Sequence, residues 1–370
     1  MTKRTRLIIL AICAVLFLVL IPFILLYSMG YRIDFENKKI VGTGGIYVRA
    51  MPNPLDITID SKTTQTGRFT PSVFVQNLLP KKHSVVIAKE GYFDYHKNLQ
   101  VKEKEVTKLE HVILFKKEIP FEILENETQS PFVKETAEDA YAIRGSALYY
   151  SNSPANASLS PAVKAAPLVT NIIAHTISND NIIWLASDGF LYQSDTNGKN
   201  AEQLSLIALQ INKKSVYELF AFNQQIFLKE NNGLLLLDAE KKSFQGFYSP
   251  MEGLSASPSN QKLIFYNEHE ISYSFLNYGI PERIFLNRFS EKITGVQWIN
   301  DDYIIFTLAG KIMISEVDAN EPNIITLPQI ITINGAPTNI KDAQILFNQE
   351  DKKLYILTKE NILASERLIP

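Results

Sequence analysis

The five histidines are the side chains best suited to metal binding or acid–base chemistry near neutral pH. No two of them have the His-x-x-x-His spacing that places a pair of imidazoles on one face of a helix. They are scattered along the chain: His83, His96, His111, His175 and His269. The single cysteine, Cys13, lies inside an apolar run, so the rest of the chain contains no disulfide and no thiolate ligand. We therefore predict no metal site.

Two short motifs partly resemble functional loops. Gly253-Leu254-Ser255-Ala256-Ser257 lacks the last glycine of a nucleophile elbow. Asp195-Thr196-Asn197-Gly198 resembles the start of a calcium loop, but its glycine comes two positions early and Leu206 stands where a bidentate Glu is needed. A hairpin turn is the simpler interpretation. Because no phosphate-binding Gly-x-x-x-x-Gly-Lys-Ser/Thr is present either, we predict no catalytic, cofactor-binding or metal residue, no cofactor, and a protein that is not an enzyme.

Composition and charge exclude other classes of protein. Of the 370 residues, 46% are hydrophobic and 21% charged, which is typical of a globular protein and not of a disordered one. Residues 1–29 contain three basic residues and no acidic one, which leaves 34 basic and 39 acidic residues in the remainder. Nucleic-acid binding requires a basic surface to offset the phosphates, so no nucleic-acid partner is predicted.

Residues 7–27 form an uncharged apolar run of 21 residues. As a helix it measures about 30 Å, the thickness of the bilayer hydrocarbon. Lys3, Arg4 and Arg6 precede it and favour a cytoplasmic N-terminus. We predict a cytoplasmic tail and single-pass membrane anchor over residues 1–29, with the following domains outside the cytoplasm. The alternative is a cleaved signal peptide, for which Ser28-Met29-Gly30 is a poor cleavage site.

Residues 30–118 show the period-two pattern of short strands. Leu55, Ile57 and Ile59 alternate with polar residues, as in a strand buried on one face. Turn residues separate several such segments, including Pro52-Asn53-Pro54 and Glu90-Gly91. The aromatic cluster in residues 92–96 is open to two interpretations, a partner-binding edge or packing across a hairpin. The pattern predicts a small β-sandwich.

This segment also resembles the PEGA domain family over about residues 44–115. The resemblance is carried by Gly45-Ile46-Tyr47-Val48, Pro52, Leu55-Asp56-Ile57-Thr58-Ile59-Asp60, Thr70-Pro71, Leu79-Pro80 and Val85-Val86-Ile87-Ala88-Lys89-Glu90-Gly91-Tyr92. Pro52-Asn53-Pro54-Leu55 replaces the Pro-Glu-Gly-Ala that gives the family its name. The resemblance implies a β-sandwich module of bacterial and archaeal envelope proteins, with a structural or adaptor role and no catalytic residue.

Residues 119–370 contain a loose repeat with an average spacing of about 41 residues, the length of one four-stranded propeller blade. The apolar core of each repeat is three residues long. The six cores are 148–150, 182–184, 225–227, 263–265, 304–306 and 354–356. Stacking small sheets around an axis buries faces that one sheet leaves exposed. We predict an all-β chain ending in a WD40-like or TolB-like β-propeller of about six blades, with five or seven open and a β-sandwich array as the alternative.

Two functions from different classes fit this architecture. The first is a membrane-anchored extracytoplasmic scaffold or adaptor whose propeller binds a protein or an envelope polymer. The second is a glycan-binding or glycan-processing propeller enzyme, because propeller active sites assemble from distant positions. The Ser/Ala/Pro-rich residues 151–167 are either an interaction loop or an exposed insertion. The residues that contact a partner are not identified by the sequence.

Overall fold

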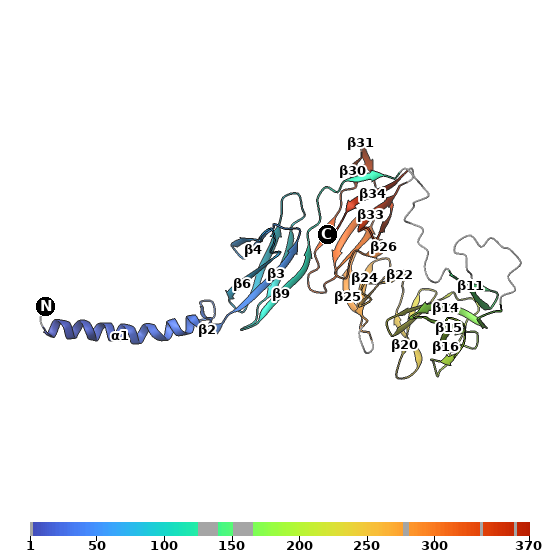
Figure 1. Cartoon of the computed structure of the whole chain (residues 1–370), viewed down its shortest axis with the longest axis horizontal. Helices are drawn as coiled ribbons and strands as arrows, with labels where there is room; N and C mark the ends of the chain where they lie inside the picture. Colours follow the sequence, from blue (N-terminus) through green and yellow to red (C-terminus); the bar gives the residue numbers. More distant parts are fainter. Residues whose placement is uncertain (1–2, 125–139, 151–165, 277–280, 334–335, 359–360) are drawn as a thin grey trace. The chain divides into compact units, whose positions relative to one another are not determined.

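The structure is a computed structural model that describes residues 3–124, 140–150, 166–276, 281–333, 336–358 and 361–370. Its described part is mostly β-strand, with one helix. The chain divides into two compact units (Figure 1). The first contains residues 1–119 and 368–370, and the second contains residues 120–367. Of the Ser/Ala/Pro-rich residues 151–167, residues 151–165 lie outside the described part of the chain.

Helix α1 (Lys3–Ser28) contains the apolar run, and none of its residues is buried. Its most apolar window has a mean hydropathy of 3.3, so the helix is long and apolar enough to cross a membrane. A signal sequence meets the same criterion. Pro22 lies inside the helix.

A two-stranded hairpin follows the helix directly. Strands β1 (Tyr31–Asp34) and β2 (Lys39–Gly42) pair antiparallel (Figure 1). Ile33 lies opposite Ile40, and Arg32 lies opposite Val41. Directly opposed residues share one face of a sheet, so these two pairs lie on opposite faces of the ribbon.

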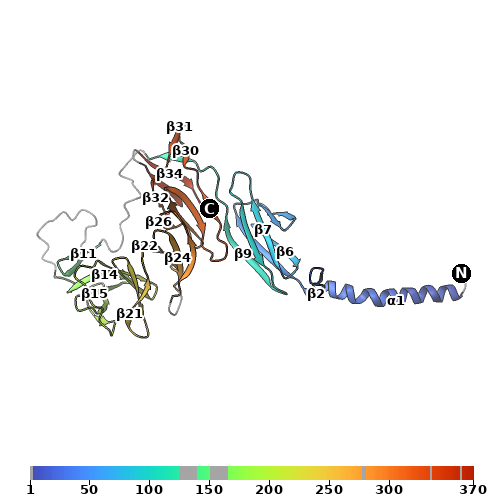
Figure 2. The same cartoon turned by 180° about the vertical axis from the view of Figure 1, so that it is seen from behind.

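Two sheets then enclose one core, as in a β-sandwich (Figures 1 and 2). One sheet has the order β6-β3-β9 and the other β5-β4-β7-β8. Strand β3 pairs antiparallel with β6 and parallel with β9. The predicted alternation is confirmed, because Leu55, Ile57 and Ile59 are all buried in this core. The strands are β3 (Gly44–Met51), β4 (Asp56–Ile59), β5 (Lys62–Gln65), β6 (Ser72–Leu78), β7 (Lys82–Ala88), β8 (Tyr95–Gln100) and β9 (Val106–Ile113).

The second unit is a series of small antiparallel sheets. Four of them each consist of four consecutive strands. These are β14 (Ile172–Ser178), β15 (Asn181–Ala186), β16 (Leu191–Asp195) and β17 (Glu202–Gln203); β18 (Tyr217–Phe222), β19 (Gln225–Glu230), β20 (Gly233–Asp238) and β21 (Ser243–Tyr248); β22 (Gly253–Ala256), β23 (Lys262–Tyr266), β24 (Glu270–Phe275) and β25 (Ile284–Arg288); and β26 (Ile293–Trp298), β27 (Tyr303–Leu308), β28 (Lys311–Glu316) and β29 (Ile324–Thr326).

One further sheet precedes these four in the sequence, and a hairpin and a last sheet follow them. The first sheet has three strands, β11 (Tyr141–Arg144), β12 (Ala147–Tyr150) and β13 (Val169–Thr170). The hairpin is formed by β30 (Ile330–Ile333) and β31 (Ala336–Asn339). The last sheet has the order β10-β34-β33-β32, so its outer strand comes from the start of the unit. These strands are β10 (Phe121–Ile123), β32 (Gln344–Phe347), β33 (Lys353–Leu357) and β34 (Ile362–Arg367).

Each of the six predicted repeat cores falls in the second strand of a separate sheet, namely β12, β15, β19, β23, β27 and β33. Three of these cores end in a fully buried aromatic residue, Phe227, Phe265 or Phe306. The interpretation of the repeat as one small sheet per unit is therefore correct. The structure establishes this series of sheets but no closed propeller among the described residues.

Apolar clusters join the four sheets from β14–β17 to β26–β29 in series. One cluster combines residues of β14–β16 with residues of β18 and β19, including Leu185 and Leu228. Another combines β19 and β20 with β23, where Phe227 and Phe265 both contribute. A third joins β23 and β24 to β26–β28 through Tyr273 and Phe306. The core of the second unit thus lies between its sheets.

Candidate functional site

The five histidines do not come together in the structure. His83 and His96 lie on adjacent strands β7 and β8, and His111 lies on β9. In the second unit, His175 lies on β14 and His269 just before β24. The described residues contain no group of three or more His, Cys, Asp or Glu side chains that is able to hold a metal ion.

The Asp195 motif forms the hairpin turn that was predicted. Strands β16 and β17 pair on either side of it. The Asp195 carboxylate accepts backbone hydrogen bonds from Asn197 and Lys199, and a side-chain hydrogen bond from Asn200. The backbone N–H of Lys199 is the main cause that lowers the pKa of Asp195. The carboxylate therefore stabilises its own turn.

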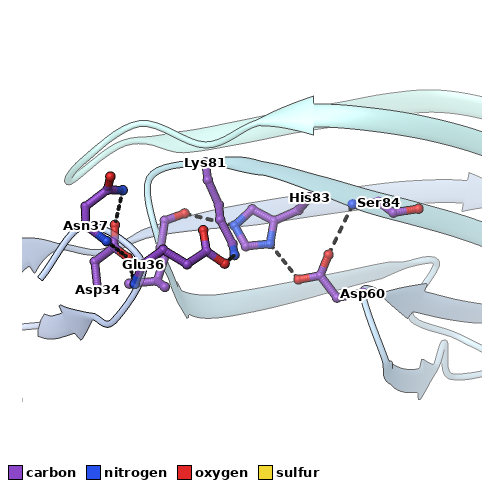
Figure 3. A network of polar contacts seen from close by, with 8 residues as sticks. Asp34, Glu36, Asn37, Asp60, Lys81, His83 and Ser84 are labelled. Atoms are coloured by element: carbon purple, nitrogen blue, oxygen red, sulfur yellow. Dashed lines mark hydrogen bonds and ion pairs between the residues drawn. The ribbon is translucent and has the colours of Figure 1, made fainter.

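Polar contacts gather where the first hairpin meets the sandwich (Figure 3). Asp34 accepts hydrogen bonds from the backbone of Glu36 and Asn37, at 3.0 and 3.2 Å, and from the Asn37 side chain at 2.8 Å. The Asn37 side chain is the main cause that lowers the pKa of Asp34. Lys81 Nζ lies 3.1 Å from Glu36 Oε1, and this hydrogen bond raises the pKa of Lys81. The hairpin turn is thus attached to the residue before β7.

A buried histidine lies beside this cluster. Figure 3 shows the His83 ring between Asp60 and the chain before β7. Its Nδ1 is 2.7 Å from Asp60 Oδ2, and its Nε2 is 2.8 Å from the carbonyl oxygen of Leu79. The carbonyl only accepts, so Nε2 carries a hydrogen. Both ring nitrogens are therefore engaged, one with the Asp60 carboxylate and the other with the Leu79 carbonyl oxygen.

The His83–Asp60 pair connects the turn after β4 to the chain before β7. His83 has no free ring nitrogen with which to accept a proton from a substrate, and its side chain is only 3% exposed. Asp60 also accepts the backbone N–H of Ser84. Sequence reasoning missed the pair because its members are 23 residues apart. No local signal in the sequence identifies it, because the two residues meet only through the pairing of β4 with β7.

Arg32 links three elements of the first unit. Its guanidinium lies 3.5 Å from the centroid of the Tyr27 ring near the end of α1, and it donates to the Tyr27 carbonyl oxygen at 2.9 Å. It also donates to Asn77 Oδ1 in β6 at 3.0 Å. A cation over an aromatic ring, with its N–H groups bonded on both sides, fixes the start of the hairpin against the helix end.

In the second unit, a polar groove lies between sheets β14–β17 and β18–β21. Its volume is about 440 Å³. Most of its polar side chains are neutral amides, which sequence reasoning did not group because they come from separate turns and strands. They are Asn179, Asn181, Gln193, Gln203, Asn223 and Gln224. Glu202, Asp238 and Lys242 add charge.

Several groove amides use their nitrogen atoms within the protein. Asn181 donates to the Asn179 carbonyl oxygen at 3.2 Å, and Gln203 donates to the Ser205 carbonyl oxygen at 2.6 Å. Gln193 donates to the Glu202 carboxylate at 3.4 Å. Donation through nitrogen orients the amide oxygens as acceptors, which suits ligands rich in hydroxyl or N–H groups.

Comparison with known proteins identifies one segment. Residues 43–114 match the PEGA domain family. The match agrees with the resemblance seen in the sequence. All seven strands of the sandwich, β3 to β9, lie within the matched residues. No curated protein matches the chain significantly.

Solved structures share only low similarity with the chain. The extracellular domain of a putative hybrid two-component system from B. thetaiotaomicron is 14% identical, with a TM-score of 0.34, over 53% of this chain and 27% of that one. A structure of S. cerevisiae dbp5 bound to nup159 and gle1 is 11% identical, with a TM-score of 0.35, over 66% of this chain and 76% of that one. The chain thus spans about a quarter of the first protein.

Proposed function

We propose that this protein is a membrane-anchored extracytoplasmic scaffold or adaptor whose second unit binds a protein or an envelope polymer. The observation that carries the proposal is the PEGA match at residues 43–114, which follows an apolar helix of membrane-crossing length. The helix and the PEGA domain fit a membrane-anchored protein with its folded units outside the cytoplasm. Lys3, Arg4 and Arg6 before the apolar run support that orientation.

The second unit is proposed to be a propeller of six sheets. In three neighbouring pairs of sheets the first strands contact each other: β14 with β18, β22 with β26, and β26 with β32. First strands gathered side by side are expected when sheets radiate from one axis. The pairing of β10 with β34 supports closure, because it joins the two ends of the unit within one sheet. A β-sandwich array provides no reason for that pairing.

A second function, glycan binding, is favoured by the amide-lined groove. Its 440 Å³ lie within the usual range of small-ligand sites. Neutral amides form paired hydrogen bonds with sugar hydroxyls without requiring a charged ligand. The two groove carboxylates already accept hydrogen bonds within the protein, Asp238 from the backbone of Glu240 and Lys241 and Glu202 from the Gln193 side chain. Because glycan hydrolysis uses two carboxyl groups that act on the substrate, binding alone is the form of this alternative that the groove supports.

Labelling of single cysteines tests the proposed topology. Cys13→Ser gives a chain without cysteine, into which Phe69→Cys, Ile330→Cys or Thr5→Cys is introduced. Phe69 and Ile330 are 93% and 64% exposed, in the first and second unit respectively. A membrane-impermeant maleimide should label both on intact cells or spheroplasts, and Thr5→Cys only after permeabilisation. Labelling of Thr5→Cys alone on intact cells would contradict the orientation.

Crosslinking tests partner binding. A photo-crosslinking residue at Gln224 in the groove should capture a partner, whereas the same residue at Ile330 serves as an exposed control outside the groove. A discrete protein adduct at Gln224 alone favours the scaffold. Retention of the protein on isolated envelope polysaccharide, lost in Gln224→Ala and Asn223→Ala, favours glycan binding. If no adduct forms at Gln224 and the protein is not retained on polysaccharide, recognition through the groove is refuted.

A further inference from the structure

The hairpin that follows α1 has one apolar face that is open to solvent. Ile33 and Ile40 are directly paired on that face, and Phe35 lies two residues beyond Ile33. They are 46%, 53% and 82% exposed. A two-stranded ribbon is at best marginally stable by itself in water. Two large apolar side chains on its open face, and a third in the adjoining turn, therefore indicate that another apolar phase covers them.

The opposite face of the hairpin is held by its own unit. Arg32, on that face, contacts Tyr27 of α1 and Asn77 of β6. Glu36, in the turn, is paired with Lys81 (Figure 3). These contacts attach the hairpin to the helix end and to the sandwich at the same time. They fix which face is left open, and it is the face of Ile33 and Ile40, next to the turn residue Phe35.

The hairpin also lies at the depth where the bilayer ends. The 26 residues of α1 measure about 39 Å, more than the roughly 30 Å of bilayer hydrocarbon, so the last turn of the helix reaches the headgroup zone. Only two residues separate Ser28 from Tyr31, which places β1 within about 11 Å of the helix end. The contact between Arg32 and Tyr27 draws β1 back toward that last turn.

We propose that the β1–β2 hairpin is a second membrane contact, whose apolar face lies in the interface of the leaflet from which α1 emerges. Ile33, Phe35 and Ile40 enter the boundary between headgroups and acyl chains, where aromatic and aliphatic side chains are favoured. Lys38, in the exposed turn, is placed to meet lipid phosphates. The proposal rests on α1 spanning the membrane, as in the proposed function.

This contact gives the PEGA domain a defined position at the membrane. A chain anchored only by a helix is free to swing about the residues that follow it. A hairpin that contacts lipid on one face, and is attached through Arg32 on the other face and through Glu36 in the turn, removes that freedom. The sandwich is then held against the bilayer.

Tryptophan fluorescence of the full-length protein in liposomes tests the proposal. Ile40→Trp places a reporter on the open face, Phe35→Trp places one in the adjoining exposed turn, and Lys39→Trp places one on the opposite face as the control. The parent chain supplies the background, since its Trp184 and Trp298 are both buried in the second unit. Lipids brominated on the acyl chain near the headgroup quench only an indole that touches the membrane interface.

Quenching and a blue-shifted emission for Phe35→Trp and Ile40→Trp, at least twofold stronger than for Lys39→Trp, are the expected result. A solvent-like emission without lipid quenching would overturn the proposal. A blue shift without lipid quenching would also overturn it, because the face would then be covered by protein, such as a second copy. Equal quenching at both faces would contradict a face-specific contact.

Flotation of the liposomes keeps this proposal separate from the proposed function. If the protein floats with the vesicles but the reporters at positions 35 and 40 are not quenched, the anchor stands and only the hairpin contact fails. If the protein does not float, the anchor itself fails. Circular dichroism of each variant excludes misfolding, and the use of two reporters, at positions 35 and 40, protects the result against the loss of one.

Discussion

Removal of strand β10 tests whether the second unit is closed on itself. We compare fragment 120–370, which retains β10, with fragment 125–370, which lacks it. In the structure β10 supplies the outer strand of the last sheet, where Phe121 pairs with Ser365 and Ile123 pairs with Leu363. These partners are about 240 residues away in sequence, so the contact is formed only when the whole unit has folded.

The cost of the deletion follows from the hydrogen bonds that are lost. The Leu124 N–H donates to the Ile362 carbonyl oxygen at 2.9 Å, and the Glu366 N–H donates to the Pro120 carbonyl oxygen at 3.1 Å. With the ladder between them, three or four bonds disappear, each with a net value of about 0.5–1.5 kcal/mol. The expected loss of stability is about 2–5 kcal/mol. For a unit of this size that lowers Tm by roughly 5–15 °C.

Urea unfolding followed by circular dichroism measures the difference between the two fragments. Glu122→Gln in fragment 120–370 is the control, because it removes only the ion pair with Lys353, worth at most about 1 kcal/mol at an exposed site. The shortened fragment also exposes the edge of β34 and should associate as its concentration rises. Equal midpoints for both fragments would refute closure through β10.

Three further outcomes are expected. Trp184→Ala should destabilise the second unit by about 3–5 kcal/mol in urea unfolding, because the ring is buried and stacks on Tyr192. His83→Ala should lower the stability of the first unit by about 1–3 kcal/mol, whereas Lys81→Ala, which breaks an exposed ion pair, should cost under about 1 kcal/mol. The backbone N–H of Lys241 lowers the pKa of Asp238 below its ordinary 3.8, so the stability that its charge contributes is present above about pH 4 and is lost as the pH falls through the lowered value. The melting temperatures of the parent and of Asp238→Asn should therefore differ at neutral pH and converge at about pH 2. A difference that stays constant with pH would show that the charge of Asp238 does not contribute to stability.

The sequence predicted the features that depend on local pattern. Alternation at Leu55, Ile57 and Ile59 identified a buried strand because side chains in a strand alternate between faces whatever the partner strand. The repeat cores identified the second strand of each sheet, because a strand with neighbours on both sides is the one most enriched in branched and aromatic residues. Asp195 and Gly198 specified a turn through short-range hydrogen bonds.

Contacts between distant residues were beyond that reasoning. His83 and Asp60 meet only because β4 and β7 are neighbours, an order that periodicity does not encode. The groove amides come from turns in two sheets, and each by itself is an ordinary turn residue. Strand β10 is three residues long and polar at its centre, so nothing local shows that it completes a sheet at the far end of the unit.

The two faces of the hairpin after α1 can be assigned only when its strand register is known. In the sequence, residues 31–42 mix apolar, acidic and basic residues without a clear pattern, and a soluble protein would tolerate such a segment. The register pairs Ile33 with Ile40 and turns Arg32 to the other face, so the mixture separates into an apolar and a polar side. In the proposed membrane arrangement, Arg32 holds the strand to the end of α1, so that separation occurs at the membrane interface, where each side meets a suitable medium. The amphipathic character of the hairpin is then a consequence of its location.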